Sequence, residues 1–402
     1  MTSVLAWIDH DPHERERMTR ILALFKERES RDELGFGSMR DSIADLLFPG
    51  TSTIMTRLRY AFFIPWIYRE LEGDSTPYEE VSRRARKEQT DLIAPLLDAQ
   101  EEGVLGRLAK GQLKRLPSSV YWAALLSWGF YRGTDSLDTY HRSFARRTRA
   151  RGSHADDLEV SEQPRSGWHP AMPSAPTDLK DSATFQLTRS EADFVKDRIL
   201  EMHPDSFLAW LVNESSEVPN IHFPWEHPSA DVRAEHREQL EHARLLSDAS
   251  HGAALLYNLM LAEVSKREED EQEFVTWIQE WSADLHAEDR PRALRNWNLD
   301  RFWQLTIARG FNISAASRAF LQQWLENSSV CSVEAFTSNA SRVLVRERER
   351  KLKGTRSRFD NATARQQWSG ASGVGRSNFR WPVTARLLRD LRAGLEATDA
   401  AT

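Results

Sequence analysis

The chain has 402 residues, of which 40% are hydrophobic, and a formal net charge of −6. This length is sufficient for two or three domains with sizeable cores. The single cysteine, Cys331, excludes an internal disulfide and a zinc site built from cysteines, and a reducing cytoplasm suits this composition. The polar, acidic start (MTSVLAWIDHDPHERER) lacks the basic segment and apolar core of a signal peptide, and no membrane-spanning run follows it.

The pattern of apolar residues predicts a mostly α-helical fold with few short strands. Helix-forming Leu, Ala, Glu and Arg are abundant, and alternating Ile, Val and Thr are scarce. The first helix is expected at Asp11-Pro12, where the aspartate can cap and the proline suits the first turn, with a short strand or extended arm before it at residues 3–9. Further helices are expected near residues 38–48, 53–71, 78–99, 118–131, 135–149, 189–200, 205–212, 230–268, 271–285, 297–308, 315–325, 333–353 and 382–395.

Two of these helices carry local signals beyond periodicity. The helix at residues 53–71 is apolar and aromatic on most of its circumference, which is typical of a helix inside a large domain. Pro65 lies within it and removes a backbone donor, so a kink or two meeting helices are expected there. A short strand from Thr184 is expected to precede a helix capped by Thr188 or Ser190.

Composition also suggests how the chain is divided. Residues 151–182 are rich in Ser, Pro, Gly and Asp, which is typical of a linker or a long surface loop. We therefore expect an N-terminal helical domain at residues 1–150, a second helical domain at 183–330, and a basic C-terminal segment with a terminal helix at 331–402.

A long motif in the first third of the chain carries a family resemblance. The run RDELGFGSMRDSIADLLFPGTSTIMTRLRY, followed by PWIYRELE, is similar to an uncharacterised bacterial family, a domain of unknown function named DUF6361. WPV at Trp381 and the run HGAALLYNLML fit the same family, so the resemblance covers nearly the whole chain. It implies no established activity, fold or catalytic residue. It does imply a gene neighbourhood among helicase and nuclease-type genes in anti-phage defence loci.

Charge is unevenly distributed along the chain. Residues 342–392 contain fourteen Lys or Arg against four Asp or Glu, a balance of +10 that leaves −16 for the remainder of a chain with net charge −6. Arginines that neutralise phosphate, interleaved with aromatic rings that can stack on bases, are typical of a nucleic-acid contact. The candidate binding residues are Arg346, Arg348, Arg350, Lys351, Lys353, Arg356, Arg358, Arg365, Arg376, Arg380, Trp368 and Trp381.

The same stretch also has a structural interpretation. RERERK is compatible with an ordinary solvated helix face whose two glutamates pair with neighbouring arginines. The aromatic residues would then anchor the C-terminal segment onto the acidic remainder of the chain.

A second candidate is an anion site ahead of the apolar helix. Thr51, Ser52 and Thr53 precede the expected helix start, and Arg57 and Arg59 follow, a combination that can hold an anion at a helix N-terminus. Plain capping by Thr51 or Thr53 is the favoured alternative. The arginines are also expected to pair with acids of the same motif. The candidates for that ionic network are Arg31, Asp32, Arg40, Asp41 and Asp45.

Other motifs are weaker. The glycines at 370–375 lack the Lys-Ser/Thr ending of a nucleotide-binding loop, and the helix–turn–helix-like pair at 297–325 offers little besides Arg318 for reading bases. Packing is the favoured role for Cys331. The histidines at 222, 227, 236, 242 and 251 have no metal-ligand spacing, and neither a metal nor a cofactor is expected. We find no convincing nuclease or hydrolase motif.

These features lead to three hypotheses. The first is a non-catalytic accessory subunit of a bacterial anti-phage defence assembly, which contacts DNA, RNA, or a helicase- or nuclease-type partner through residues 342–392 and has no membrane partner. The second is a protein-interaction scaffold without nucleic-acid binding, anchored by some of the 14 tryptophans. The third is a nuclease-type enzyme of unrecognised class.

Overall fold

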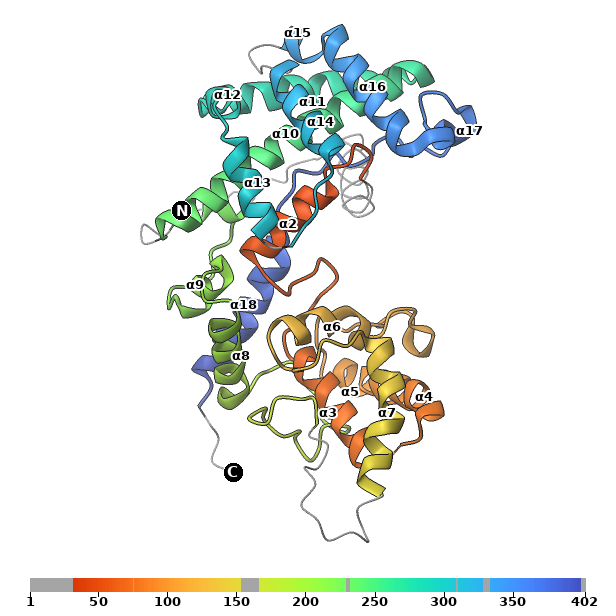
Figure 1. Ribbon diagram of the computed structural model, residues 1–402, viewed down its shortest axis with the longest axis vertical. Helices are drawn as coiled ribbons and strands as arrows, with labels where there is room; N and C mark the ends of the chain where they lie inside the picture. The colour runs from red at the N-terminus through yellow and green to blue at the C-terminus, as the bar shows by residue number, and fades with distance from the viewer. Residues whose placement is uncertain are drawn as a thin grey trace, which may run out of the picture. The chain divides into compact units, whose positions relative to one another are not determined.

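The computed structural model describes residues 32–74, 76–152, 166–228, 232–308, 310–327 and 333–398; for position 78 and residues 145–152 only the backbone is described. Within these ranges the chain is helical, and its β-structure is confined to one antiparallel bridge between Tyr131 and Trp168 (Figure 1). The α-helical class is confirmed. The strand expected from Thr184 does not form. The expected helix at Asp11, the arm before it and Cys331 lie outside the described residues.

The chain forms two compact units, each assembled from separated segments. Unit 1 comprises Met1–Ile43 and Arg237–Phe379, and unit 2 comprises Ala44–His236 and Arg380–Thr402. The boundaries fall inside helix α2 (Gly37–Leu47), inside helix α10 (Ala234–Ser265) and after Phe379. This division differs from the consecutive domains expected from the sequence, because the C-terminal segment contributes to both units.

Unit 2 is built around α3 (Tyr60–Gly73), whose residues from Tyr60 to Tyr68 are all buried. The helix runs through Pro65 without ending, so the two separate helices considered at this position do not occur. α3 begins at Tyr60, later than expected. The other elements of unit 2 are α4 (Tyr78–Asp91), α5 (Ile93–Asp98), η1 (Lys110–Gln112), α6 (Pro117–Ser127), α7 (Leu137–Gly152), α8 (Arg189–Met202), α9 (Phe207–Asn213), η2 (Pro224–Glu226) and α18 (Trp381–Glu396).

An aromatic cluster fills one part of the unit 2 core. Rings from α3, α6 and α7 meet those on both sides of the β-bridge, with centroids 5.1–6.3 Å apart, and such pairs stabilise beyond their buried area. The hydroxyl of Tyr140 donates to Glu72 at 2.9 Å, which satisfies this buried carboxylate. The cluster consists of Tyr68, Trp122, Tyr131, Tyr140 and Trp168.

The described part of the expected linker packs onto unit 2. Trp168 and Met172 are buried, and the indole of Trp66 donates to the carbonyl of Pro173 at 2.8 Å. Residues 166–182 therefore form a surface loop anchored on α3.

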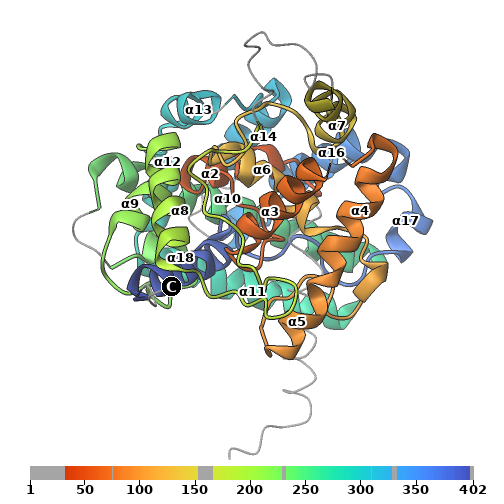
Figure 2. The same cartoon turned by 90° about the horizontal axis from the view of Figure 1, so that it is seen from below.

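The terminal helix α18 completes unit 2 by packing against α8 (Figure 2). The contact is close because Gly394 faces Leu187 and Ala192, where a Cβ would lie within 2.8 Å of both side chains. α8 starts with a capping box in which Thr188, one of the two expected cap residues, accepts from the Glu191 amide.

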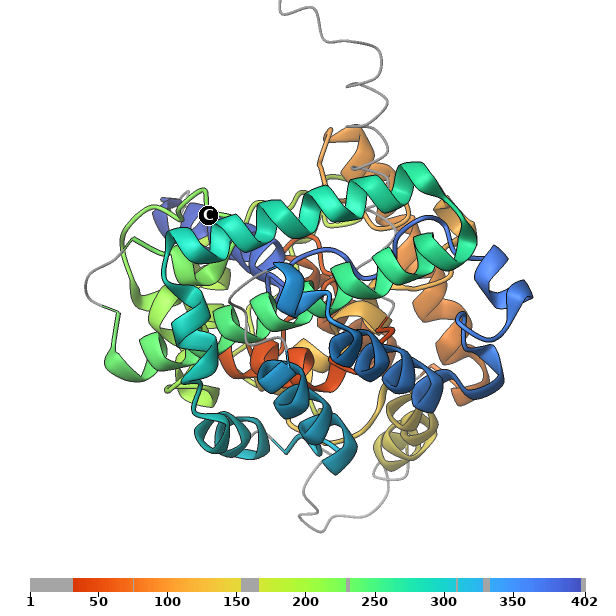
Figure 3. The same cartoon turned by 90° about the horizontal axis from the view of Figure 1, so that it is seen from above.

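Unit 1 is centred on α10 and α11 (Glu268–Ala287), which lie side by side (Figure 3). Gly252 of α10 lies beneath the indole of Trp281, and a Cβ there would come within 2.5 Å of the ring. Asn258 of α10 bonds the loop at 368–372 through both its amide atoms. The other elements are α12 (Arg290–Arg295), α13 (Leu299–Ala308), α14 (Ala315–Asn327), α15 (Val333–Phe336), α16 (Asn339–Lys353), η3 (Gly354–Arg356) and α17 (Ala362–Gln366).

Candidate functional site

The basic C-terminal region was the main candidate, and most of its side chains lie within the two units. α16 carries the densest part, and it packs against α14 in unit 1. Because a basic side chain must reach solvent to meet a phosphate, the partners and exposure of each cation decide what the region can bind.

Arg348 is buried on the inner face of α16. Its Nε donates to the carbonyl of Leu34 at 2.8 Å and an Nη donates to Ser317 at 2.8 Å. Burial lowers the pKa of this guanidinium. Gly35 permits the contact, because its φ is +80° and a Cβ there would lie 2.2 Å from the Arg348 Nη. Arg348 therefore ties the N-terminal segment to α16.

Glu33 binds two of the predicted cations. Its carboxylate lies 2.9 Å from Arg358 and 3.0 Å from Lys353, and the Glu33 side chain is only 6% exposed. Arg358 also donates to Tyr257 at 3.2 Å and Ser372 at 3.1 Å. This cluster holds the segment after α16 against α10.

Arg376 belongs to a second internal cluster. It lies 2.6 Å from Asp248 of α10, which also binds Arg290 at 3.1 Å. Burial raises the pKa of Asp248, and the two arginines oppose that shift. Asp284, 3.4 Å from Arg376, adds a second carboxylate.

Several other predicted residues also have internal partners. Arg350 bonds Asp360 and Glu347, and these bonds raise its pKa. Arg365 donates to the carbonyls of Arg358 and Phe359. In unit 2, Arg380 lies 2.5 Å from Asp45. The indoles of Trp368 and Trp381 are buried and donate to Asn258 at 3.0 Å and to the Ile221 carbonyl at 3.0 Å.

For three predicted cations, the side chain makes no hydrogen bond or ion pair in the described chain. Lys351 and Arg356 are exposed, and Arg346 is half-buried with its guanidinium 5.6 Å from the centroid of the Phe359 ring. They lie along α16 and η3 of unit 1. We call Arg346, Lys351 and Arg356 the α16 cation face.

The proposed anion site does not sit at a helix start. Residues 53–59 precede α3, and the Thr51 hydroxyl donates to the Phe48 carbonyl at 2.7 Å. Arg57 binds Asp390 at 3.0 Å and Glu101 at 3.2 Å, and Arg59 binds Glu191 at 2.9 Å. The acids expected to pair with these arginines have other roles.

Asp32 instead accepts from the backbone at the start of α2, with the Gly35, Phe36 and Gly37 amides at 2.6–2.9 Å. Ser52 is half-buried and Thr53 is exposed. Both candidate arginines are therefore held by carboxylates.

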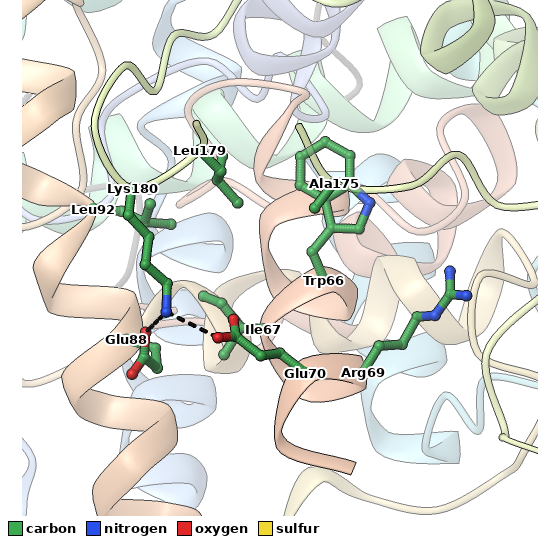
Figure 4. Close-up of a pocket in the computed structure, with 9 residues that line it drawn as sticks. All are labelled: Trp66, Ile67, Arg69, Glu70, Glu88, Leu92, Ala175, Leu179 and Lys180. Atoms are coloured by element: carbon green, nitrogen blue, oxygen red, sulfur yellow. Dashed lines mark hydrogen bonds and ion pairs between the residues drawn. The ribbon is translucent and has the colours of Figure 1, made fainter. Parts of the chain in front are cut away.

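A recess of about 380 Å³ lies in unit 2 between α3, α4 and the loop at 175–180 (Figure 4). Trp66, Ile67 and Leu92 supply apolar surface. On one wall Lys180 lies 2.8 Å from Glu88 and 3.0 Å from Glu70, and the bond to Glu88 raises the pKa of Lys180. Arg69 points away from this ion pair (Figure 4). The lining holds no His, Cys, Ser, Thr or Tyr, so it contains none of the usual nucleophile–base pairs.

The histidines are not arranged as metal ligands. Among the described residues, no group of three or more His, Cys, Asp or Glu is placed to hold a metal ion. His242 accepts a hydrogen bond from the Trp297 indole at 2.7 Å, and His236 lies 3.3 Å from the Asp205 carbonyl. In the same part of the chain, no helix combines the length and apolar character needed to cross a bilayer.

The helix–turn–helix-like pair is used for packing. α14 buries Phe320, Leu321 and Trp324, and the Trp324 indole donates to the Ala249 carbonyl at 2.9 Å. Arg318 lies over the Trp303 ring and bonds the Ile313 carbonyl.

Sequence reasoning missed one cationic surface, the loop at residues 105–116 of unit 2. Its basic residues are exposed and have no side-chain partner among the described residues. The available signal was the absence of Asp and Glu from residue 103 to residue 134. We call this segment the basic loop; its cations are Arg107, Lys110, Lys114 and Arg115.

Comparison with known proteins identifies the family and no activity. A family of unknown function, DUF6361, matches residues 2–394. The chain belongs to this family. No curated protein and no solved structure matches the chain. The DUF6361 match spans segments of both units and includes the motif at residues 31–60 and the C-terminal region as far as residue 394.

Proposed function

We propose that this DUF6361 protein is a non-catalytic accessory subunit that contacts nucleic acid, or a nucleic-acid-processing partner, through the α16 cation face. The resemblance described above implies a gene neighbourhood in anti-phage defence loci, and we propose that setting for this chain. The observation that carries the proposal is that Lys351 and Arg356 lie in water without a carboxylate partner in the described chain, while neighbouring cations are paired.

The chemistry of this face suits a phosphate backbone. A polyanion gains most from cations whose charge is not already neutralised, because each phosphate contact releases a condensed counterion. Arg346 lies over the half-buried Phe359 ring, so the face combines positive charge with an aromatic edge. The proposed contact therefore uses three cations, fewer than the candidate residues that the sequence of residues 342–392 offered.

The scaffold hypothesis depended on exposed tryptophans, and the described residues offer none. Trp210, Trp225, Trp277 and Trp303 are half-buried, and the other tryptophans of the described ranges are buried. An anchor must be accessible before binding to contribute. We therefore do not favour the scaffold as the leading function.

Binding of a 30-base-pair duplex and a 30-nucleotide strand, measured across a salt series, tests the proposal. In the triple variant R346Q/K351Q/R356Q, we expect the slope of log K against log salt to become shallower by about 2 to 3. The matched control is R83Q/R142Q/R189Q, which removes the same charge from exposed cations that are already paired with carboxylates.

We expect the control to retain affinity within about twofold, since paired surface cations have little free charge to offer. Equal slopes for the wild type and the R346Q/K351Q/R356Q variant would show that the α16 cation face makes no such contact. An equal loss in both triple variants would show that only net charge matters.

A further inference from the structure

The cations of the basic loop differ from the paired arginines of the C-terminal region. In the C-terminal region, guanidinium groups bind Asp248, Glu33 and Asp45. In the basic loop, four Lys or Arg occur between residues 107 and 115, and none has a carboxylate partner among the described residues. A second group of unpaired cations therefore lies in unit 2, outside the C-terminal region.

The base of the loop is fixed by hydrogen bonds. The Leu105 amide donates to the Tyr60 hydroxyl at 2.9 Å, which ties the loop to α3. Arg86 of α4 donates to the Leu113 carbonyl at 3.0 Å. Because the bond is made by the side chain of an exposed arginine, it also brings a fifth cation to the base of the loop.

The tip of the loop has an unusual backbone. Lys110 has φ of +45°, in the left-handed region that non-glycine residues rarely adopt, and it begins the 3₁₀ turn η1. The Lys110 amide donates to the Gly106 carbonyl at 2.6 Å, which closes the turn. Residues held in such conformations cluster at binding sites. The cations are thus presented from an ordered turn.

The nearest acids in the sequence do not cancel this charge. Glu101 binds Arg57 and the Phe185 amide, and Asp91 binds Lys87. Asp98 and Glu102 are exposed at the approach to the loop and contribute the remaining negative charge. Four basic residues and no acids between residues 105 and 116 leave the loop strongly cationic.

We propose that the basic loop is a second nucleic-acid contact, which binds the phosphate backbone independently of the α16 cation face. A duplex carries about one negative charge per 1.7 Å of axis, the highest charge density among common cellular partners, and suits a dense group of unpaired cations. An acidic protein surface usually intersperses its carboxylates with its own cations and would match the loop less well.

Leu108 distinguishes a nucleic-acid contact from a protein or lipid contact. Its side chain is 97% exposed at the centre of the loop, the largest value among the large apolar side chains in the described ranges. A backbone contact made by charge does not need it, whereas docking into an apolar recess of a protein or insertion into an anionic lipid surface would.

Anisotropy with a labelled 30-base-pair duplex across a salt series tests the proposal on the full-length chain. For R107Q/K110Q/K114Q/R115Q we expect at least a tenfold loss of affinity at 0.1 M salt and a slope shallower by about 3 to 4. The double variants R107Q/K110Q and K114Q/R115Q are each expected to lose about half of the slope change. If the quadruple variant does not fold, the affinities and salt slopes of the two double variants test the proposal.

The control R83Q/K87Q/R142Q/R189Q removes the same charge from exposed unit 2 cations that are paired with carboxylates, and it is expected to bind within about twofold of wild type. L108A is also expected to bind within twofold. Unchanged duplex affinity in both double variants, or an equal loss in the control, would overturn the proposal.

Two further outcomes would overturn it in favour of another partner. One is a loss for L108A as large as that of the quadruple variant. The other is binding to vesicles containing phosphatidylglycerol that requires Leu108 and exceeds duplex binding. The two surfaces are separable: a loss in the loop variants with none in R346Q/K351Q/R356Q would retain this inference and remove the α16 contact.

Discussion

Individual arginines in the C-terminal region act mainly as internal ties. Arg348 and Arg358 bond Leu34 and Glu33, respectively, which lie more than 300 positions earlier in the chain. Their bonds close unit 1 around its N-terminal segment. A buried ion pair is costly to break from one side, because the remaining charge is left without a partner.

Glu33 provides a direct measure of this role. We expect E33Q to lower the free energy of unfolding of unit 1 by about 3 kcal/mol, because Arg358 and Lys353 would lose their shared carboxylate. Chemical denaturation followed by tryptophan fluorescence measures the change. E347Q, which removes an exposed carboxylate from Arg350, should cost no more than about 0.5 kcal/mol. Equal effects of the two changes would contradict an internal role for Glu33.

His251 makes unit 1 sensitive to mild acid. It lies on α10 against the Trp281 ring, and burial lowers its pKa to about 4, with Arg376 acting in the same direction. At pH values between about 4 and 6.5, His251 is protonated in the unfolded state and neutral in the folded state. Stability is therefore full above pH 6.5 and falls as the pH falls.

We expect a loss of up to about 2 kcal/mol between pH 6.5 and 5 from this residue, and a flatter profile for H251Q over the same range. His242, whose pKa burial also lowers, contributes in the same direction and remains in the variant. An NMR titration of His251 with a midpoint near 6.5 would contradict the account.

Among the elements, the pairing of α8 with α18 depends on a glycine. An alanine at 394 would gain about 1 kcal/mol of helix propensity, but its methyl would meet Leu187 and Ala192 side chains at 2.7 and 2.8 Å. Both contact atoms are Cβ atoms fixed to the backbone, so they cannot swing away. Overpacking of this kind costs about 1–3 kcal/mol and should outweigh the propensity gain.

We therefore expect G394A to destabilise unit 2 by about 1–2 kcal/mol, measured by thermal or urea unfolding. G73A is the matched control, because no atom lies within 4 Å of a Cβ at the end of α3. It should be neutral or slightly stabilising. A stable G394A would show that α8 and α18 are less closely packed than described.

At the scale of elements, local signals predicted much of the fold. The α-helical class follows from periodicity, and the start of α18 follows from Pro382. Thr188, one of the two hydroxyl residues expected to cap α8, is the cap. The errors lie where several residues compete to start or end a helix. α3 starts at Tyr60 because residues 53–58 form turns whose amides bond elsewhere, including the Thr56 and Arg57 amides to Tyr121.

The partners of the basic residues could not be predicted in the same way. Arg57 binds Asp390, which lies 333 positions along the chain, and Arg59 binds Glu191 at a separation of 132. Pairing over such distances depends on the tertiary packing, and charge counts along the sequence do not report it. The net charge of +10 in residues 342–392 is correct, but many of these cations bind carboxylates of the same chain and are not available to a partner.

For the whole molecule, the positions of the unpaired cations are a better guide to a nucleic-acid contact than the net charge of each sequence segment. Unit 1 retains the α16 cation face, and unit 2 retains the basic loop. These two surfaces hold seven basic residues whose side chains make no hydrogen bond or ion pair in the described chain. If the protein meets a nucleic acid, these residues should supply most of the salt-dependent affinity.

The salt dependence of duplex binding by a variant lacking all seven cations tests this claim most directly. The variant combines R346Q/K351Q/R356Q with R107Q/K110Q/K114Q/R115Q, and wild type and a variant in which seven exposed, carboxylate-paired cations are changed to Gln serve as references. We predict that the slope of log K against log salt becomes shallower by about 6 in the first variant and by less than about 1 in the paired-cation reference. Equal slopes for wild type and the first variant, or equal losses in both variants, would contradict the account.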